Sequence, residues 1–259
     1  MKTIKIQCPA KINLDLRIFP KDPITGFHPI KSIMQTISLF DYLTISIKDG
    51  EGINLTGNSD EIPYNENNLC HKAAKAFLNK INKNYSIDIN IEKNIPVCAG
   101  LAGGSTDAAG VLFGLNKLLD EPLNNEELHK LASTLGSDLN FCLEGGTKLC
   151  TGRGEKLTNM PFYSFELSLM KPKDLKISTK EAYEAFDRLT QESDMRNDLE
   201  FALLDKYEEL RFMHNHDMQM SGSGPTFFMR DKNVDFKYDK EKYIVYNDLY
   251  SVPTGVSEA

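Results

Sequence analysis

The chain has 259 residues, of which 41% are hydrophobic and 26% are charged, and its formal net charge is −7. This balance is typical of a globular protein and excludes a disordered chain, and the length provides for a sizeable buried core. The acidic total disfavours a nucleic-acid partner, because sequence-independent binding of DNA or RNA depends on basic surface. No apolar run of about eighteen residues occurs in the sequence, so we expect no membrane partner.

The first half of the chain is dominated by expected strands. Apolar residues recur at every second position in residues 30–47 and 86–92, which indicates half-buried strands. Two further strands are expected at residues 3–8 and 12–19, and a helix is expected at residues 68–81.

Helices and strands are mixed in the second half. Apolar residues at helical spacing predict a helix from residue 105 to about 119. Two capping boxes mark further helix starts, one formed by Asn124 with Glu127 and one by Ser178 with Glu181. The remaining expected elements are helical segments at 197–215, a Gly-rich turn at 220–224 and a short strand at 226–229.

This order of elements predicts an α+β fold. It lacks the regular strand–helix alternation of a doubly wound parallel sheet. A second, smaller α+β domain is expected to begin near residues 160–165, which gives two domains, residues 1–160 and residues 161–259, with no long linker between them.

The cysteines indicate a reducing compartment. Their number is odd and no two have C-x-x-C spacing, which argues against a disulfide framework and a zinc site. The N-terminal segment is interrupted by lysine and glutamine and does not form the apolar core of a signal peptide. We therefore expect a cytoplasmic protein whose cysteines are small buried hydrophobic residues: Cys8, Cys70, Cys98, Cys142 and Cys150.

A Gly-rich loop is the most informative segment. Gly100, Gly103 and Gly104 lie between the expected strand at 86–92 and the following helix. Such a loop presents unpaired backbone N–H groups at the positive end of a helix dipole, which is a phosphate-binding arrangement. The sequence lacks the Walker A and dinucleotide-binding patterns. At this point a Gly-rich turn without a ligand is an equally good interpretation.

Three segments together resemble the GHMP kinase superfamily. PAKINLDL lies near the N-terminus, IPVCAGLAGGSTDAAG in the middle and MSGSGPTFF near the C-terminus. The resemblance is narrowed by Gly26-Phe27-His28, LGSDLNFCL and TGRGEKL to the branch whose members phosphorylate an alcohol that carries a CDP group. It covers the chain up to about Met229, and the last thirty or so residues match weakly.

The resemblance implies two domains with the active site in the cleft between them. It implies transfer of a phosphoryl group from ATP to the 2-hydroxyl of a methylerythritol unit carrying CDP, on the non-mevalonate route to isoprenoid precursors. The implied partners are ATP, Mg²⁺ and this small-molecule substrate, and the implied assembly is a monomer or homodimer. The alternatives are a superfamily kinase that acts on another small alcohol and a relative that binds nucleotide without catalysis.

Phosphoryl transfer requires a phosphate cradle, a cation, a group that handles the hydroxyl proton and a substrate clamp. The resemblance assigns the general base to Asp138 and a neighbouring cation, hydrogen-bonded to it, to Lys11. From the residues alone, Asp138 is equally a turn residue after the Gly136 helix end, and Lys11 a solvated lysine. A nearby ammonium would keep the carboxylate ionised and polarise the substrate oxygen.

The remaining site residues follow from the same resemblance. The expected hydroxyl beside magnesium is that of Ser105, with Thr106 as the alternative. Gly222 and Gly224 are expected to hold a tight turn beside the phosphate loop, and Phe27 is expected to stack on cytosine. The expected substrate contacts are Asn13, Phe27, His28 and Tyr183, of which Tyr183 is equally well explained as a core residue. The expected ATP contacts are Asn68, Lys93, Pro96, Gly100, Leu101, Ala102, Gly103, Gly104, Ser105 and Thr106.

The pair His214 and His216 carries no functional prediction. Histidines two positions apart on a helix do not share a face, and no ligand set accompanies them. We expect both on the solvated surface.

Overall fold

The computed structural model describes residues 1–259 and contains a seven-stranded and a four-stranded sheet. The fold is α+β, as the sequence predicts. The elements are β1 (Lys2–Ile18), β2 (Ile30–Lys48), β3 (Gly52–Gly57), α1 (Leu69–Ile81), β4 (Ser86–Glu92), α2 (Gly103–Leu118), α3 (Asn125–Leu135), α4 (Leu139–Glu144), β5 (Thr147–Gly152), β6 (Lys156–Asn159), β7 (Glu166–Pro172), α5 (Thr179–Phe186), α6 (Asp198–Leu204), α7 (Glu208–His214), β8 (Gln219–Met220), β9 (Phe227–Arg230), β10 (Tyr243–Tyr250) and β11 (Ser257–Glu258).

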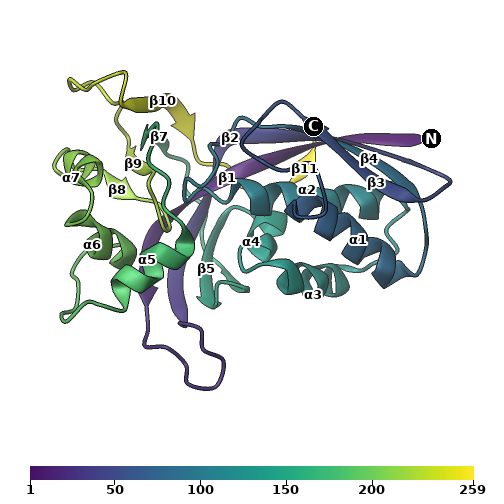
Figure 1. Ribbon diagram of the computed structural model, residues 1–259, viewed down its shortest axis with the longest axis horizontal. Helices are drawn as coiled ribbons and strands as arrows, with labels where there is room; N and C mark the ends of the chain where they lie inside the picture. The colour runs from purple at the N-terminus through teal and green to yellow at the C-terminus, as the bar shows by residue number, and fades with distance from the viewer.

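The seven-stranded sheet forms the first part of the molecule. Its main order is β11-β1-β2-β4-β3, with β5 paired to β2 and β6 to β5. Helices α1 to α4 cover one face of this sheet (Figure 1). The alternation in β2 and β4 places Leu43, Ile45 and Ile89 in the core against the apolar face of α2.

Strand β1 differs from the expectation of two separate strands. It runs unbroken from Lys2 to Ile18, but its pairing with β2 shifts register between Pro9 and Ala10 and again between Asn13 and Asp15. Proline has no N–H to donate to the ladder, so a bulge accommodates it within the strand. The expected interruption is therefore a bend rather than a break.

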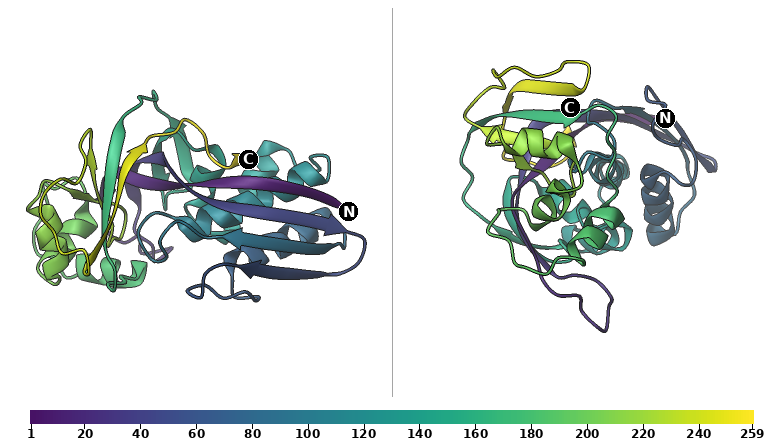
Figure 2. Two further views of the ribbon diagram at one scale, coloured as in Figure 1. Left: turned by 90° about the horizontal axis from the view of Figure 1, so that it is seen from above. Right: turned by 60° about the vertical axis from the view of Figure 1, so that its left-hand side comes forward.

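The four-stranded sheet, in the order β10-β7-β9-β8, packs with helices α5 to α7. Its core also contains Leu16, Ile18 and Ile30, because the far ends of β1 and β2 extend into this part. Figure 2 shows both long strands running between the two ends of the molecule. The connection at residues 19–29 projects beyond them.

The end of the chain returns to the first sheet. After β10, Val252 and Val256 are buried, and β11 pairs with β1 so that Ile6 lies opposite Glu258. The path of this segment is tight, because a Cβ atom on Gly145 would lie 2.1 Å from the backbone nitrogen of Gly255. The last nine residues therefore complete the sheet that the first residues begin.

The predicted helix starts are confirmed with one difference. The Asn124 side chain accepts from Glu127 N, and the Glu127 carboxylate accepts from Asn124 N, which completes the expected capping box. Ser178 caps α5 by accepting from Glu181 N, but the Glu181 carboxylate contacts Lys206 and Tyr207 instead. The second box is therefore only half formed, because a cation and a phenol compete for the carboxylate.

Helix α3 ends at Gly136 as expected, with extended backbone at φ 175°. One expectation about the cysteines needs correction. Cys98 is exposed, whereas the other four cysteines are buried as expected, and all five are free. The expected helical segments at 197–215 are α6 and α7. Seven strands have no counterpart among the expected strands: β3, β5, β6, β7, β8, β10 and β11.

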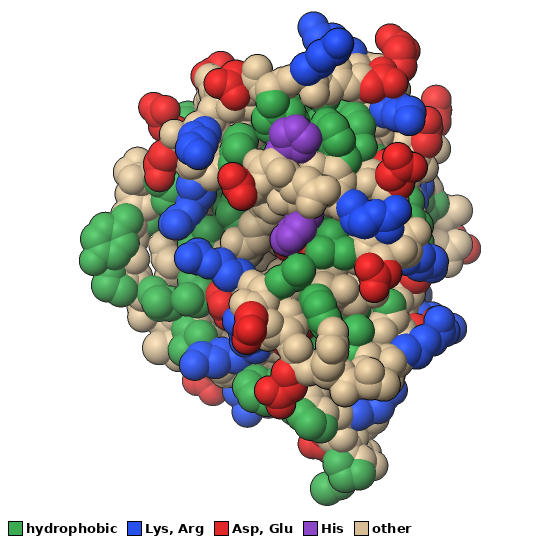
Figure 3. Space-filling model, turned by 90° about the vertical axis from the view of Figure 1, so that its left-hand side faces the viewer, with side chains coloured by type: hydrophobic (Ala, Val, Ile, Leu, Met, Phe, Trp, Pro, Cys, Tyr) green, Lys and Arg blue, Asp and Glu red, His purple; other side chains and the backbone are tan.

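The surface shows no single sign of charge on the end formed by the four-stranded sheet and its helices. Basic and acidic side chains are interspersed there with scattered hydrophobic ones (Figure 3). No helix combines the length and the apolar composition needed to span a membrane.

Candidate active site

A cavity of about 1040 Å³ lies where the two parts of the molecule meet. Its walls come from β1, the loop before α2 and the start of α4 on one side, and from α5 and the turn after β8 on the other. The cavity brings together almost all predicted site residues: Lys11, Asn13, Phe27, His28, Asn68, Lys93, Pro96, Gly100, Ala102, Gly103, Gly104, Ser105, Asp138 and Tyr183.

The N-terminus of α2 opens into this cavity. The preceding residue, Ala102, has φ 59° and provides no side-chain cap, so the first N–H groups of the 16-residue helix remain available. A Cβ atom on Gly104 would meet nothing within 4 Å, which places open space beside the first turn. Backbone donors and the helix dipole together make this end suitable for a phosphate group.

Two predicted loop residues do not line the cavity. Leu101 is buried in an apolar cluster with Ala10 and Ile12. Thr106 is fully buried and its hydroxyl has no partner. The periodicity of the helix explains the difference, because Ser105 and Thr106 point in different directions and only Ser105 faces the cavity.

The phosphate loop is packed against the turn that follows β8, as predicted for Gly222 and Gly224. Gly100 has φ 73°, and a Cβ atom there would lie 2.2 Å from the Ser221 carbonyl oxygen. The Ser221 hydroxyl donates to the Gly100 carbonyl over 3.0 Å. A Cβ atom on Gly222 would lie 3.1 Å from Lys11 Nζ. These glycines allow the loop, the turn and Lys11 to approach closely.

Lys11 and Asp138 face each other across the cavity floor. Lys11 is only 4% exposed, and its Nζ donates to Asn13 Oδ1 over 2.6 Å. Lys11 Nζ lies 3.8 Å from Asp138 Oδ2, an ion pair that is longer than the expected hydrogen bond. Asn13 also donates to Ser32 Oγ over 2.8 Å, which fixes its amide. The ammonium is therefore held beside a half-exposed carboxylate.

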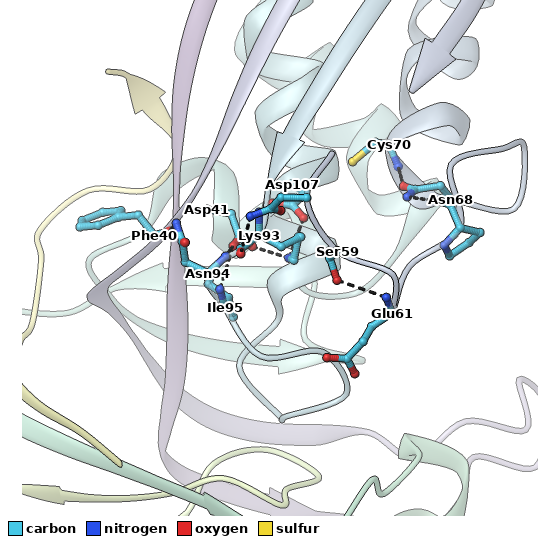
Figure 4. Close-up of polar contacts among 12 residues, drawn as sticks. Phe40, Asp41, Ser59, Glu61, Asn68, Cys70, Lys93, Asn94, Ile95 and Asp107 are labelled. Atoms are coloured by element: carbon cyan, nitrogen blue, oxygen red, sulfur yellow. Dashed lines mark hydrogen bonds and ion pairs between the residues drawn. The ribbon is translucent and has the colours of Figure 1, made fainter. Parts of the chain in front are cut away.

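Lys93 lies between two buried carboxylates, Asp41 and Asp107 (Figure 4). Its Nζ contacts Asp41 Oδ2 and donates to Asp107 Oδ2 over 2.8 Å. Asp41 Oδ1 accepts two more hydrogen bonds, from the backbone N–H groups of Asn94 and Ile95. Asp107 Oδ1 has no partner. Asp41 is thus better satisfied as an anion than Asp107.

The electrostatics of this cluster follow from that difference. Burial raises the pKa of Asp107 to about 8; the Lys93 ammonium opposes this rise and the nearby Asp41 carboxylate adds to it. Burial alone lowers the pKa of Lys93, but the two carboxylates outweigh it and the net pKa is raised. Lys93 therefore stays charged, and Asp107 keeps its proton until the pH approaches its raised pKa.

Asn68 lines the cavity as the N-cap of α1. Its Oδ1 accepts from Cys70 N over 2.8 Å and its Nδ2 donates to the Pro63 carbonyl over 2.6 Å (Figure 4). Both ends of this amide, like the Lys93 ammonium, are engaged by the protein itself.

The expected clamp residues lie at the other end of the cavity. Phe27 is 54% exposed, with the Arg153 guanidinium 4.9 Å from its ring centre. His28 Nδ1 lies 2.8 Å from the Phe19 carbonyl oxygen, and His28 Nε2 lies 3.0 Å from Asp187 Oδ1. The Tyr183 ring lies 5.5 Å from the His28 ring, and burial, with the Asp138 charge, raises the pKa of Tyr183 to about 12.

No group of three or more His, Cys, Asp or Glu side chains is arranged to hold a metal ion. Mg²⁺ in phosphoryl-transfer sites takes most of its ligands from phosphates and water and few from protein. The side chains at this cavity fit only that mode of Mg²⁺ binding, because Ser105 offers a hydroxyl while Asp107 is bound to Lys93.

Sequence reasoning missed Asp41, Asp107 and Arg153. Asp41 shares the inward face of β2 with Leu43 and Ile45. A single carboxylate on a buried apolar face requires a buried partner, and this pattern is the signal in the sequence. Asp107 lies inside the middle motif, but the motif alone assigns it no role. No pattern in the sequence pointed to Arg153, because its position at the cavity depends on how the turn between β5 and β6 packs.

The fold and the site define a GHMP kinase. Residues 68–146 match the family described as the GHMP kinases N terminal domain. Homoserine kinase from Cytophaga hutchinsonii has a TM-score of 0.74 at 16% identity, covering 100% of this chain and 98% of that one, and shows the shared fold.

Relatives with higher identity narrow the family. A protein from Syntrophomonas wolfei named 4-diphosphocytidyl-2-C-methyl-D-erythritol kinase is 38% identical over 264 residues, covering 90% of this chain and 92% of the relative. A solved 4-(cytidine 5'-diphospho)-2C-methyl-D-erythritol kinase has a TM-score of 0.73 at 28% identity, covering 87% and 89%. The chain belongs to the 4-diphosphocytidyl-2-C-methyl-D-erythritol kinase family.

Proposed function

We propose that the protein transfers the γ-phosphoryl group of ATP to the 2-hydroxyl of 4-diphosphocytidyl-2-C-methyl-D-erythritol, in the cytoplasm and as part of isoprenoid precursor synthesis. The observation that carries this proposal is the single cavity in which a free helix N-terminus, Lys11 and Asp138 converge, in a chain 38% identical to a kinase of that name.

Asp138 is the general base of the proposed reaction. Its carboxylate accepts the proton of the 2-hydroxyl as the oxygen attacks the γ-phosphorus and ADP leaves. Lys11 lies 3.8 Å away and is held by Asn13, so its charge stabilises the ionised carboxylate and the developing negative oxygen. The three side chains need little rearrangement to act.

The phosphates of ATP bind at the start of α2. The N–H groups of Gly103, Gly104 and Ser105 supply donors there, and the helix dipole favours the negative charge. Mg²⁺, when bound, neutralises part of the phosphate charge, and the Ser105 hydroxyl is the protein ligand available to hold it.

The cytidine end of the substrate binds at Phe27 and His28. The exposed Phe27 ring offers a face for the base. The His28 ring lies beside it in the cavity, held between the Phe19 carbonyl and the Asp187 carboxylate. Tyr183 adds a second aromatic wall beside His28. A small alcohol such as homoserine would leave this end of the cavity unused.

The proposal is tested by assaying ATP-dependent phosphorylation of 4-diphosphocytidyl-2-C-methyl-D-erythritol beside homoserine and mevalonate. We expect turnover on the CDP-linked alcohol only. Asp138→Asn should lower kcat roughly 10²–10⁴-fold while ATP still binds, and Lys11→Ala should also lower it. Asp120→Asn, at an exposed surface carboxylate, is the matched control. Turnover on the small alcohols alone, or near-normal turnover by Asp138→Asn, would contradict the proposal.

A further inference from the structure

Arg153 carries the cavity's only cation without an acidic partner. Among the other basic residues that line the cavity, Lys11 pairs with Asp138 and Lys93 with Asp41 and Asp107. The remaining pairs are Lys21 with Asp187 at 3.6 Å and Lys180 with Glu184 at 3.8 Å. The Arg153 guanidinium forms no salt bridge or hydrogen bond, and it lies over the Phe27 ring. Glu155, two residues on, accepts from the Arg153 backbone N–H instead.

Arg153 also occupies the middle of the proposed substrate path. Its neighbour Gly154 packs beside the catalytic end, because a Cβ atom on Gly154 would lie 3.8 Å from Asp138 Oδ1 and 3.6 Å from Ser137 Cβ. Its guanidinium carbon lies 4.9 Å from the centre of the Phe27 ring, at the cytidine end. The side chain therefore spans the distance between the two ends of the cavity.

The proposed substrate has its charge at the corresponding place. A diphosphate separates the cytidine from the alcohol that reacts, so it has to pass between Phe27 and Asp138. The carboxylates of Asp138, Glu184 and Asp187 line this cavity, and the whole chain has a net charge of −7. A diphosphate entering here needs a free local cation, and guanidinium binds phosphate oxygens through two parallel N–H donors.

We propose that Arg153 binds the diphosphate of the CDP-linked substrate and thereby selects it over uncharged or small alcohols. This inference rests on the proposed function. In the free protein the guanidinium covers a face of Phe27. When the substrate binds, the guanidinium moves to the diphosphate and leaves that face to the cytosine ring, so charge recognition and base stacking occur together.

The first experiment measures binding without turnover. Isothermal titration calorimetry compares CDP with cytidine on the wild type, Arg153→Gln and Arg153→Lys. We expect CDP to bind the wild type more tightly than cytidine, and Arg153→Gln to weaken CDP about tenfold while leaving cytidine unchanged. Arg153→Lys should fall between them, because it keeps the charge and loses the fork. Equal losses for CDP and cytidine would assign Arg153 to supporting Phe27 and overturn the proposal.

Arg230→Gln is the matched control. Arg230 also lies over an aromatic ring, 5.5 Å from the centre of Phe165, and its loss changes the net charge equally, but it does not line the cavity. We expect this variant to bind CDP as the wild type does. A tenfold loss in Arg230→Gln as well would make the effect one of net charge and overturn the proposal.

The second experiment separates the two substrates. In steady-state kinetics, Arg153→Gln should raise the KM for the CDP-linked alcohol about tenfold, with kcat within about twofold and the KM for ATP unchanged. A raised KM for ATP instead would place Arg153 on the ATP phosphates and overturn the proposal. Wild-type inactivity on the CDP-linked alcohol would refute the proposed function, whereas wild-type activity with an unchanged KM in Arg153→Gln would refute only the role of Arg153.

Discussion

The cluster of Asp41, Lys93 and Asp107 places one cation between two buried carboxylates beside the phosphate-binding loop. Two ionised carboxylates and one ammonium leave a net negative charge in a buried site, which is costly. Asp107 lowers this cost by keeping its proton, and its pKa is raised as a result.

The first prediction concerns the pH dependence of stability. In the unfolded chain Asp107 ionises near the ordinary aspartate pKa of 3.8, whereas in the folded protein its pKa is about 8. Between these pH values the folded state keeps a proton that the unfolded state has released, so this group lowers the free energy of unfolding as pH rises. Its slope is at most about 1.4 kcal/mol per pH unit, and the effect levels off above pH 8.

Asp107→Asn should remove this slope. The amide oxygen can still accept from Lys93, and no carboxyl proton remains to be released. The free energy of unfolding, measured by urea titration from pH 5 to 9, should therefore decline less steeply in the variant than in the wild type. Asp49→Asn, at an exposed turn, controls for the loss of one acidic residue. Parallel curves for Asp107→Asn and the wild type would contradict the assignment of the proton.

At the scale of elements, α6 holds the turn that follows β8. The Asn197 side chain caps α6 through Oδ1, and its Nδ2 donates to the carbonyls of Met220 and Gly222 over 2.8 and 2.9 Å. Glu200 Oε2 accepts from Met220 N over 2.8 Å. Because Gly222 abuts Lys11, the start of α6 positions the lysine that we propose as catalytic, without touching it.

The second prediction compares the same substitution at two helix caps. Asn197→Asp keeps the cap but removes both donors to the turn, so it should cost roughly 1–3 kcal/mol of stability and lower kcat at temperatures where the protein is folded. Asn124→Asp changes an exposed cap whose amide nitrogen has no partner, so it should change stability by less than about 0.5 kcal/mol. Urea unfolding and steady-state kinetics measure both. A normal kcat in folded Asn197→Asp would contradict the positioning role.

Local signals predicted the elements that depend on local physics. The caps at Asn124 and Ser178 and the alternation in β2 and β4 are sequence-local, and each is present in the structure. The short strands β5, β10 and β11 are defined by partners far away in the chain, so their own residues carry little signal. The same reason explains the site: motifs predicted Lys11 and Asp138, whereas the pairing of Asp41 with Lys93 required the packed sheet.

At the scale of the whole molecule, we propose that residues 1–160 and residues 161–259 form two domains. The far ends of β1 and β2 and the final segment are exceptions, because each packs with the other domain. The two parts share an apolar cluster that contains Ala99 and Leu101 of the phosphate loop with Leu167 and Phe228 of the second sheet. The loop that we propose to bind phosphate is therefore also part of the contact between the sheets.

The third prediction tests this double role with two glycines of one loop. Gly100→Ala forces a side chain onto positive φ and against the Ser221 carbonyl, so it should destabilise the protein by about 2–4 kcal/mol. Gly104→Ala faces open space and should change stability by less than about 1 kcal/mol, while its methyl group raises the KM for ATP. Thermal unfolding and kinetics on both variants check this, and equal stability of the two would contradict it.

The return of β11 to β1 has a consequence for protein synthesis. Strand β1 leaves the ribosome long before β11 is made, so one edge of the first sheet stays unpaired until β11 emerges. Until then the positions that Val252 and Val256 will cover remain open to water and to other chains. The nascent protein therefore completes its first sheet only after the second sheet has been synthesised, because β11 follows β10 in the chain.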